Sequence, residues 1–402
     1  MKKILALIII LTALIGSNQG QQKLTEIFGV VSDSAGNPVQ DLTVFIPFTS
    51  KGTTTNTKGE YRLEKIPIGE LELVFRHVSY RPLTKTLTLN PGNPIELNVR
   101  MQGNVIELAE IVKRANPANW KFGYEKFKEH VLGDPLGRFC EVINPTDIYF
   151  YYDGEKLTGN ATEPLEIINK YLGYKLVYFL DYFWYNKDKT NPDGSTQQVS
   201  FAFSGSAFYV DQIEENVLRR RTWGKNRVTE FHGTLKHFLL SVFYDQVGEQ
   251  GFEIRHAWTD INDLQKSENI SPSMAYVRSL LMEKRFYWDK SLKKSIYLLY
   301  IPDKNYPIQS KITDLNQVPP AKSILLDDNL LVFYYWNSNH DMDDARVAYL
   351  TISPDESGII PVLLFDGQGN YTVKGGEVIW DYLDTQTKLV TALPADYPGT
   401  NQ

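Results

Sequence analysis

Two strand-like segments and the turns beside them lie in the stretch TNTKGEYRLEKIPIGELELVFRH, which covers residues 55–77. Residues 61–63 form the first segment and residues 71–77 the second, and both are rich in residues that favour β-structure. Lys58 and Gly59 precede the first segment, and Ile-Pro-Ile-Gly at residues 66–69 separates the two, so a turn is expected at each place. The stretch therefore predicts short antiparallel strands.

The same pattern continues on both sides and gives seven short strand segments between residues 23 and 101. The other five cover residues 25–31, 42–48, 51–56, 84–89 and 95–99. Short strands with turn signals at this spacing are typical of an antiparallel β-sandwich. Three glycines, Gly36, Gly59 and Gly69, fall at the turns, where we expect a positive φ that a Cβ atom would penalise.

The order of residues in this sandwich region is similar to that of a known family. The matching residues are Gly29 to Asp33, Gly36 to Val39, Val44, Thr55, Asn56, Gly59, Tyr61, Ile66, Pro67, Gly69, Ser79 and Tyr80. They resemble the carboxypeptidase-regulatory-like (transthyretin-like) domain, which is found fused to exported proteins and TonB-dependent receptors. Asn56 replaces a frequent Asp of the family and Ser79 a frequent Gly. The resemblance implies a β-sandwich over residues 23–101 that carries no catalytic residues of its own.

The N-terminus has the layout of a secretory signal peptide. Lys2 and Lys3 precede an apolar run from Ile4 to Ile15, and small and polar residues follow as far as Gly20. The apolar run is too short for a transmembrane helix and suits a signal sequence. We predict a signal peptide over residues 1–20 and no transmembrane segment in the mature chain. The expected location is the periplasm or an association with the outer membrane.

Charge and cysteine content exclude several classes of function. The formal net charge is −6, whereas nucleic-acid binding requires a basic surface, so no nucleic-acid partner is expected. The dense basic cluster Arg219–Arg221 is interpreted as solvated side chains on a strand or turn. Because Cys140 is the single cysteine, neither an intramolecular disulfide nor a cysteine zinc site can form.

A linker is predicted over residues 102–117, and a mixed α+β region over residues 118–402. Helices are expected over residues 120–132, residues 235–247 after Thr234, and residues 163–173, where Pro164 and Gly173 resemble helix ends. Most other segments resemble strands, so the whole chain is predicted to be mainly β with some α. The pattern leaves open whether residues 118–402 form one domain or two, with a division near 190–270.

Part of this region also resembles a module of exported proteins. The similarity lies in Glu163-Pro-Leu165, Asn169 and Leu172-Gly-Tyr174. The module has no established activity, so the resemblance implies an exported location and no chemistry.

The sequence contains no recognisable catalytic or metal-binding motif. Ser204-Gly-Ser206 lacks the Gly-x-Ser-x-Gly spacing of a nucleophile elbow. His232 and His237 would diverge by about 140° on one helix, which leaves a set of His232, His256 and Asp260 as the metal alternative. We favour a non-catalytic protein without a catalytic residue, metal or cofactor. The alternative is a periplasmic or surface hydrolase whose catalytic group is dispersed over residues 118–402.

Three aromatic segments could form a stacking surface for a sugar or a peptide. They cover residues 149–152, 178–185 and 333–336, and from them we select Tyr149, Tyr151, Trp184 and Trp336 as binding residues. The alternative is that such strands pack their aromatic side chains on both faces as core. We therefore predict an exported envelope protein that binds an outer-membrane or surface protein, a peptide or a glycan. The sequence specifies neither the ligand nor the oligomeric state.

Overall fold

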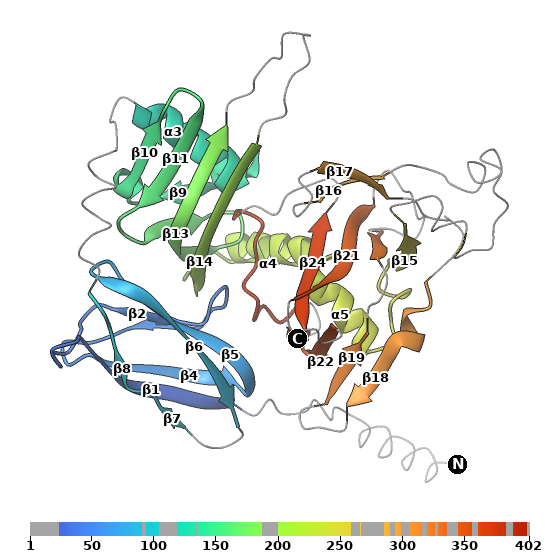
Figure 1. Cartoon of the computed structure of the whole chain (residues 1–402), viewed down its shortest axis with the longest axis horizontal. Helices are drawn as coiled ribbons and strands as arrows, with labels where there is room; N and C mark the ends of the chain where they lie inside the picture. The colour runs from blue at the N-terminus through green and yellow to red at the C-terminus, as the bar shows by residue number, and fades with distance from the viewer. Residues whose placement is uncertain are drawn as a thin grey trace. The chain divides into compact units, whose positions relative to one another are not determined.

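The computed structural model describes residues 24–90, 94–103, 119–133, 135–186, 200–258, 266, 285–289, 294–298, 306–315, 320–325, 329–335, 345–355, 361–382 and 389–399. The predicted signal peptide and nearly all of the predicted linker lie outside these ranges. The described part consists mostly of strands in antiparallel sheets with a few helices, which confirms the predicted fold class (Figure 1). The chain divides into two compact units, residues 1–47 with 51–109 and residues 48–50 with 110–402.

The first unit is a sandwich of two four-stranded sheets. One sheet has the order β4 (Glu60–Pro67), β1 (Leu24–Ser32), β7 (Ile95–Glu96), and β8 (Val99–Arg100) also pairs with β1. The other sheet has the order β3 (Gly52–Thr54), β2 (Thr43–Phe45), β5 (Gly69–His77), β6 (Tyr80–Leu89). One buried cluster joins both sheets and includes Ile27 and Leu63 from the first with Val44 and Phe75 from the second.

The strands and turns of this sandwich agree with the sequence pattern. All seven predicted segments contain strand, and the segment at residues 95–99 is divided into β7 and β8, which run parallel to β1. The three glycines predicted to have positive φ do so, with values of 88° at Gly36, 73° at Gly59 and 125° at Gly69. A Cβ at Gly59 would also overlap the carbonyl oxygen of Val31, so glycine is needed there for space as well as for conformation.

The second unit begins with a six-stranded sheet. Its order is β10 (Ile148–Tyr152), β11 (Lys156–Ala161), β13 (Tyr174–Asn186), β12 (Leu165–Asn169), β9 (Cys140–Val142), and β14 (Ser200–Asp211) also pairs with β13. The helix predicted over residues 120–132 is present as α3 (Trp120–Phe127), which continues as a π-helical turn over Lys128–Gly133. Helix α3 packs on one face of the sheet, where Phe127 meets Phe183 and Gly123 leaves room for Phe150.

The predicted helix over residues 163–173 is wrong, because this segment forms strand β12 and a turn. Along β12, Leu165, Ile167 and Asn169 are buried and the residues between them are less so, which is the period of a strand. Residues 170–173 then turn the chain into β13, with φ at 73° for Gly173. Pro164 and Gly173 therefore mark the ends of a strand and its turn.

The rest of the second unit combines two helices with two further four-stranded sheets and a hairpin. The helices are α4 (Val217–Phe231) and α5 (Leu235–Phe243). One sheet has the order β15 (Phe252–Ala257), β20 (Asn329–Tyr334), β21 (Arg346–Pro354), β24 (Gly376–Tyr382). The other has the order β18 (Ile312–Leu315), β19 (Ala321–Ile324), β22 (Val362–Asp366), β23 (Tyr371–Lys374), and β16 (Arg285–Asp289) pairs with β17 (Lys294–Leu298). Helix α5 shares a core with both sheets through Phe238, Val332 and Leu363.

Capping residues explain where the two helices begin. Thr234 caps α5 as predicted, since its hydroxyl oxygen accepts a hydrogen bond of 3.2 Å from the backbone N–H of His237. Asn216 caps α4, and its side-chain oxygen accepts from the backbone N–H groups of Leu218 and Arg219. The interpretation of Arg219–Arg221 as a strand or turn is therefore wrong, although the three side chains are exposed as expected.

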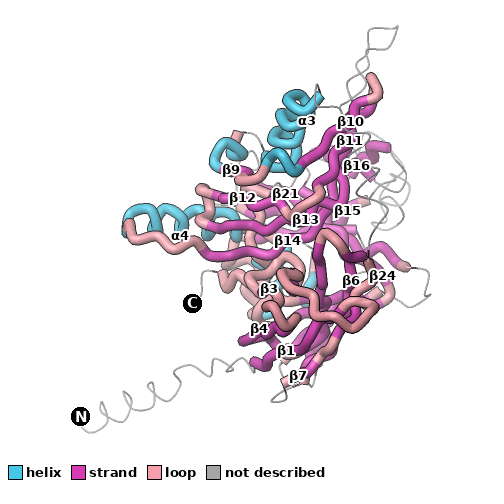
Figure 2. Tube along the Cα trace, turned by 90° about the vertical axis from the view of Figure 1, so that its left-hand side faces the viewer, coloured by secondary structure: helices cyan, strands magenta, loops and turns pink. Residues whose placement is uncertain are grey.

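None of the helices within the described ranges combines the length and the apolar character needed to cross a bilayer. Figure 2 shows the same elements after a turn of the molecule, with strands predominating over helices.

Candidate functional site

Three of the four residues selected from the sequence lie on one face of the six-stranded sheet. Ile148 and Phe150 of β10 and Phe183 of β13 point into the core beneath α3. Because successive side chains of a strand alternate between the two faces, Tyr149, Tyr151 and Trp184 point to the face opposite α3, called the outer face below.

Strand register places two of these residues in one row across the sheet. Tyr151 of β10 pairs with Thr158 of β11, Thr158 pairs with Trp184 of β13, and Trp184 pairs with Ala202 of β14. We call Tyr151, Thr158, Trp184 and Ala202 the aromatic row. At a strand spacing of about 4.8 Å, the backbones of Tyr151 and Trp184 lie roughly 10 Å apart, with a small polar residue between them.

The neighbours of the aromatic row add polar groups and one cation. The Lys156 ammonium group lies 5.1 Å from the centroid of the Trp184 ring, on the same face. Tyr182 lies two residues before Trp184 on the same face and is 45% exposed, and Tyr151 is 44% exposed. Ser204 pairs with Tyr182 and Asn160 pairs with Tyr149, so hydroxyl and amide groups separate the rings.

The aromatic row retains hydrogen-bonding capacity for a ligand. The hydroxyl of Thr158 donates to the carbonyl oxygen of Tyr151 at 3.4 Å, which joins the two strands. Within the described part of the chain, the Tyr151 hydroxyl and the Trp184 indole N–H have no hydrogen-bond partner. The row therefore offers ring faces for stacking, with a hydroxyl and an indole N–H as donors at the ring edges.

The third aromatic segment belongs to a different sheet. Phe333 of β20 and Tyr335 beside it are buried in a separate cluster that also contains Leu331 and Tyr349. Trp336, the fourth selected residue, lies outside the described residues. Phe333 and Tyr335 are therefore core residues, as the alternative interpretation of the aromatic strands predicts.

His237, one of the histidines considered as metal ligands, is part of the protein core. Its Nδ1 accepts from the backbone N–H of Gly233 at 3.1 Å, and its Nε2 lies 3.3 Å from Oε1 of Gln250, so both ring nitrogens have partners. Burial lowers the pKa of His237 to about 4. The neutral imidazole packs between the rings of Phe252 and Phe231 and has a structural role.

The described residues do not show the predicted metal set of His232, His256 and Asp260 as a site. His256 stacks on Trp258 with ring centroids 4.1 Å apart, and Asp260 lies outside the described residues. In the described ranges, no group of three or more His, Cys, Asp or Glu side chains is arranged to hold a metal ion.

Sequence reasoning missed a buried polar network around Glu230 at the end of α4. Tyr171 donates its hydroxyl to Glu230 Oε1 at 2.9 Å, and Arg346 of β21 forms an ion pair of 3.3 Å with Oε2. Arg346 also donates to the carbonyl oxygen of His232 at 2.9 Å. Burial and the Glu230 carboxylate raise the pKa of Tyr171 to about 12, so the phenol stays protonated and donates. Residues far apart in sequence form the network, and no local pattern signals it.

The first unit, with two sheets around one core, is a small β-sandwich module. Residues 27–112, most of which belong to this unit, match the family model of the CarboxypepD_reg-like domain, which confirms the resemblance drawn from the sequence. The match covers about a fifth of the chain. A search of the curated proteins gave no match.

Two similar solved structures match the chain at low TM-scores. A mutant type II cohesin–X-dockerin complex from Acetivibrio cellulolyticus is 20% identical over 19% of this chain and 56% of that chain, with a TM-score of 0.16. The chain thus spans little more than half the length of that structure. A candidate carbohydrate-binding protein from Bacteroides uniformis is 11% identical over 89% of this chain and 98% of that chain, with a TM-score of 0.17. Scores at this level establish no common fold.

Proposed function

We propose that this chain is an exported, non-catalytic envelope protein that binds a glycan on the outer face of the six-stranded sheet. The observation that carries the proposal is the aromatic row, in which Tyr151 and Trp184 lie in register on either side of Thr158. The support for export is the N-terminal sequence pattern together with the CarboxypepD_reg-like domain.

Sugar rings suit this row better than an apolar protein surface does. The negative face of an aromatic ring attracts the weakly positive C–H groups of a sugar, and the polar groups between the rings can bind its hydroxyls. The core of a protein interface is usually more apolar, whereas Thr158, Asn160 and Ser204 are distributed among the aromatic side chains here. An extended chain of sugars could contact both rings at once.

The geometry of the aromatic row supports binding without hydrolysis. Glycoside hydrolysis needs two carboxyl groups on either side of the scissile bond. The row consists of Tyr151, Thr158, Trp184 and Ala202, and none of these carries a carboxyl group.

The test is a binding titration of the chain against soluble polysaccharides by isothermal calorimetry and affinity electrophoresis. Replacing Trp184 or Tyr151 by Ala should each weaken binding by about 1 kcal/mol, or roughly fivefold, through loss of a stacking face. Both side chains are at least partly exposed, so the unfolding midpoint should change little.

The matched control is Tyr371→Ala, which removes an exposed aromatic side chain from β23 in another sheet and should leave binding unchanged. Equal affinity of the parent and the Trp184→Ala variant for every polysaccharide that binds would refute the proposed site. If no polysaccharide binds, and the parent captures a protein that the Trp184→Ala variant does not, the partner of this face is a protein.

A further inference from the structure

Helix α4 and the loop before it present apolar and basic side chains together on an exposed surface. Ile213 is 99% exposed, Leu218 71% and Val217 50%. Arg221 and Lys225 follow on α4 and are also exposed. We call these five residues the α4 patch. Neighbouring apolar side chains at such exposure are uncommon on a monomer and usually indicate a surface that is covered in use.

The opposite side of α4 is fixed to the turn between β12 and β13. Trp223 donates its indole N–H to the carbonyl oxygen of Lys170 at 3.0 Å, and Asn226 donates to that of Tyr171 at 2.7 Å. Arg227 donates to the carbonyl oxygens of Leu172 and Gly173 at 2.7 and 3.1 Å. Four consecutive carbonyl groups thus hold one side of the helix, and the α4 patch projects from the other.

Helical spacing separates the two sides. Leu218, Arg221 and Lys225 are three and four residues apart and therefore share one face of the helix. Trp223, Asn226, Arg227 and Glu230 lie at the same spacing on the face that contacts the protein.

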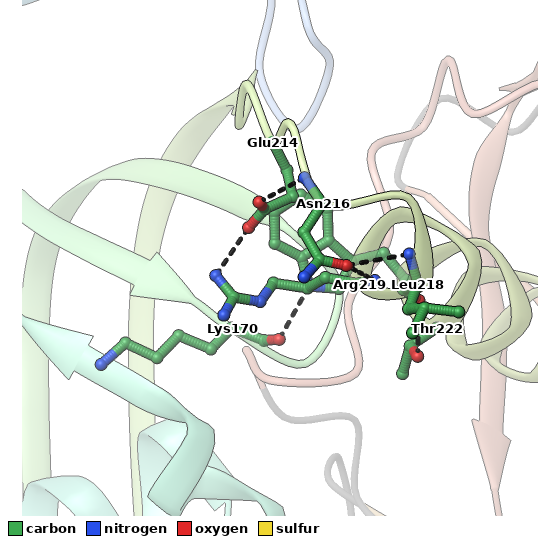
Figure 3. A network of polar contacts seen from close by, with 7 residues as sticks. Lys170, Glu214, Asn216, Leu218, Arg219 and Thr222 are labelled. Carbon is green, nitrogen blue, oxygen red and sulfur yellow. Dashed lines mark hydrogen bonds and ion pairs between the residues drawn. The ribbon is translucent and has the colours of Figure 1, made fainter.

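The loop that carries Ile213 is held by its own hydrogen bonds, as Figure 3 shows around Glu214. The Glu214 carboxylate accepts from the backbone N–H of Asn216 at 2.9 Å and from the Arg219 guanidinium at 2.6 Å. Asn216 in turn caps the helix through Leu218 and Arg219. The apolar side chains are therefore presented by an ordered loop and helix start, which lowers the conformational cost of binding.

The charge of the α4 patch is opposite to that of the chain. Arg219 is neutralised by Glu214, whereas Arg221 and Lys225 form no ion pair among the described residues. The exposed Glu215 offsets part of this charge, and a surplus of positive charge remains on a protein whose formal net charge is −6. Charge complementarity therefore selects an anionic partner.

We propose that the α4 patch docks the protein on the surface of a bilayer that contains anionic phospholipids. Ile213, Val217 and Leu218 enter the boundary between headgroups and acyl chains, while Arg221 and Lys225 pair with lipid phosphates. This division of apolar and basic side chains is that of interfacial membrane-binding segments. A lipid surface suits Ile213 in particular, because a side chain that protrudes at 99% exposure can enter a fluid layer without a shaped pocket.

The test is flotation of the chain without residues 1–20 with two kinds of vesicle, pure phosphatidylcholine and an equimolar mixture with phosphatidylglycerol. We expect binding to the mixed vesicles, weak binding to the neutral ones, and release at high salt. Each basic side chain near an anionic bilayer contributes about fivefold in partitioning, so the double variant Arg221→Gln, Lys225→Gln should bind roughly 25-fold more weakly. The double variant Ile213→Ser, Leu218→Ser should weaken binding while keeping its salt dependence.

The matched control is the double variant Arg81→Gln, Lys85→Gln, which makes the same charge change at exposed positions of β6 and should bind like the parent. Equal binding of the parent and the Arg221→Gln, Lys225→Gln variant to mixed vesicles would overturn the proposal. So would failure to bind vesicles combined with specific capture of an acidic protein. The Trp184→Ala variant should float normally, so this test stands apart from that of glycan binding.

Discussion

His237 shows how the environment of one residue sets its charge. A histidine in an apolar helical pattern is compatible with a metal ligand, a switch or a core residue. The structure gives both ring nitrogens protein partners and surrounds the ring with aromatic side chains. Burial lowers the pKa of His237, and the stability of the protein therefore depends on pH.

We expect the free energy of unfolding to fall as the pH drops from 6.5 towards 4. Above pH 6.5 His237 is neutral in both states, and below it the unfolded chain takes up a proton that the folded protein refuses until about pH 4. The loss from this residue is at most about 3 kcal/mol. This loss is measured by urea denaturation of the parent and of the His237→Gln variant at several pH values. If the free energy of unfolding of His237→Gln depends on pH as steeply as that of the parent, the prediction is contradicted.

At the scale of elements, the turn between β12 and β13 explains the pattern Glu163-Pro-Leu165, Asn169, Leu172-Gly-Tyr174. The buried Asn169 side chain accepts from the backbone N–H groups of Tyr171 and Leu172 and donates to the carbonyl oxygen of Val390 at 2.8 Å. A Cβ at Gly173 would overlap the Trp223 indole, so glycine permits α4 to approach. These residues form a structural joint between strand, turn and helix.

Replacing Asn169 by Ala should destabilise the second unit by about 2 kcal/mol or more. The change leaves two N–H groups and one carbonyl group without their side-chain partner in a buried place. Chemical denaturation followed by tryptophan fluorescence measures the loss. The control is Asn160→Ala on the outer face, which is only partly buried and should cost less than about 0.5 kcal/mol. Equal effects of the two variants would argue against this role of Asn169.

At the scale of the whole molecule, the chain distributes its core among several clusters. One cluster fills the sandwich of the first unit, and separate clusters lie under α3 and around α5 in the second. The first unit contains both of its sheets and a closed core, which are the requirements for a domain that folds by itself.

We therefore expect a fragment of residues 24–103 to fold alone. It should give a β-type circular dichroism spectrum and a cooperative thermal transition. Phe75→Ala in the same fragment removes a fully buried ring, costs about 3–5 kcal/mol and should abolish the transition. Val30→Ala is the control, since this side chain on β1 is 39% exposed and its loss should lower the midpoint only slightly. A fragment without a cooperative transition would show that the sandwich needs the rest of the chain.

The sequence by itself determined the sandwich and the start of helix α5. Gly36, Gly59 and Gly69 mark turns because their backbone conformation is a local property that glycine alone adopts cheaply. Thr234 begins α5 for a similarly local reason, a hydrogen bond three residues along the chain.

Only the tertiary structure decided which distant residues meet. Tyr151 joins Trp184 in one row while Phe333 and Tyr335 are buried elsewhere, because strand register depends on pairing between remote segments. The sequence of residues 163–173 fits a helix or a strand, and its pairing with β9 and β13 selects the strand. Arg219–Arg221 lie on a helix whose other side is bound to carbonyl groups of residues 170–173, a contact between segments that no local pattern contains.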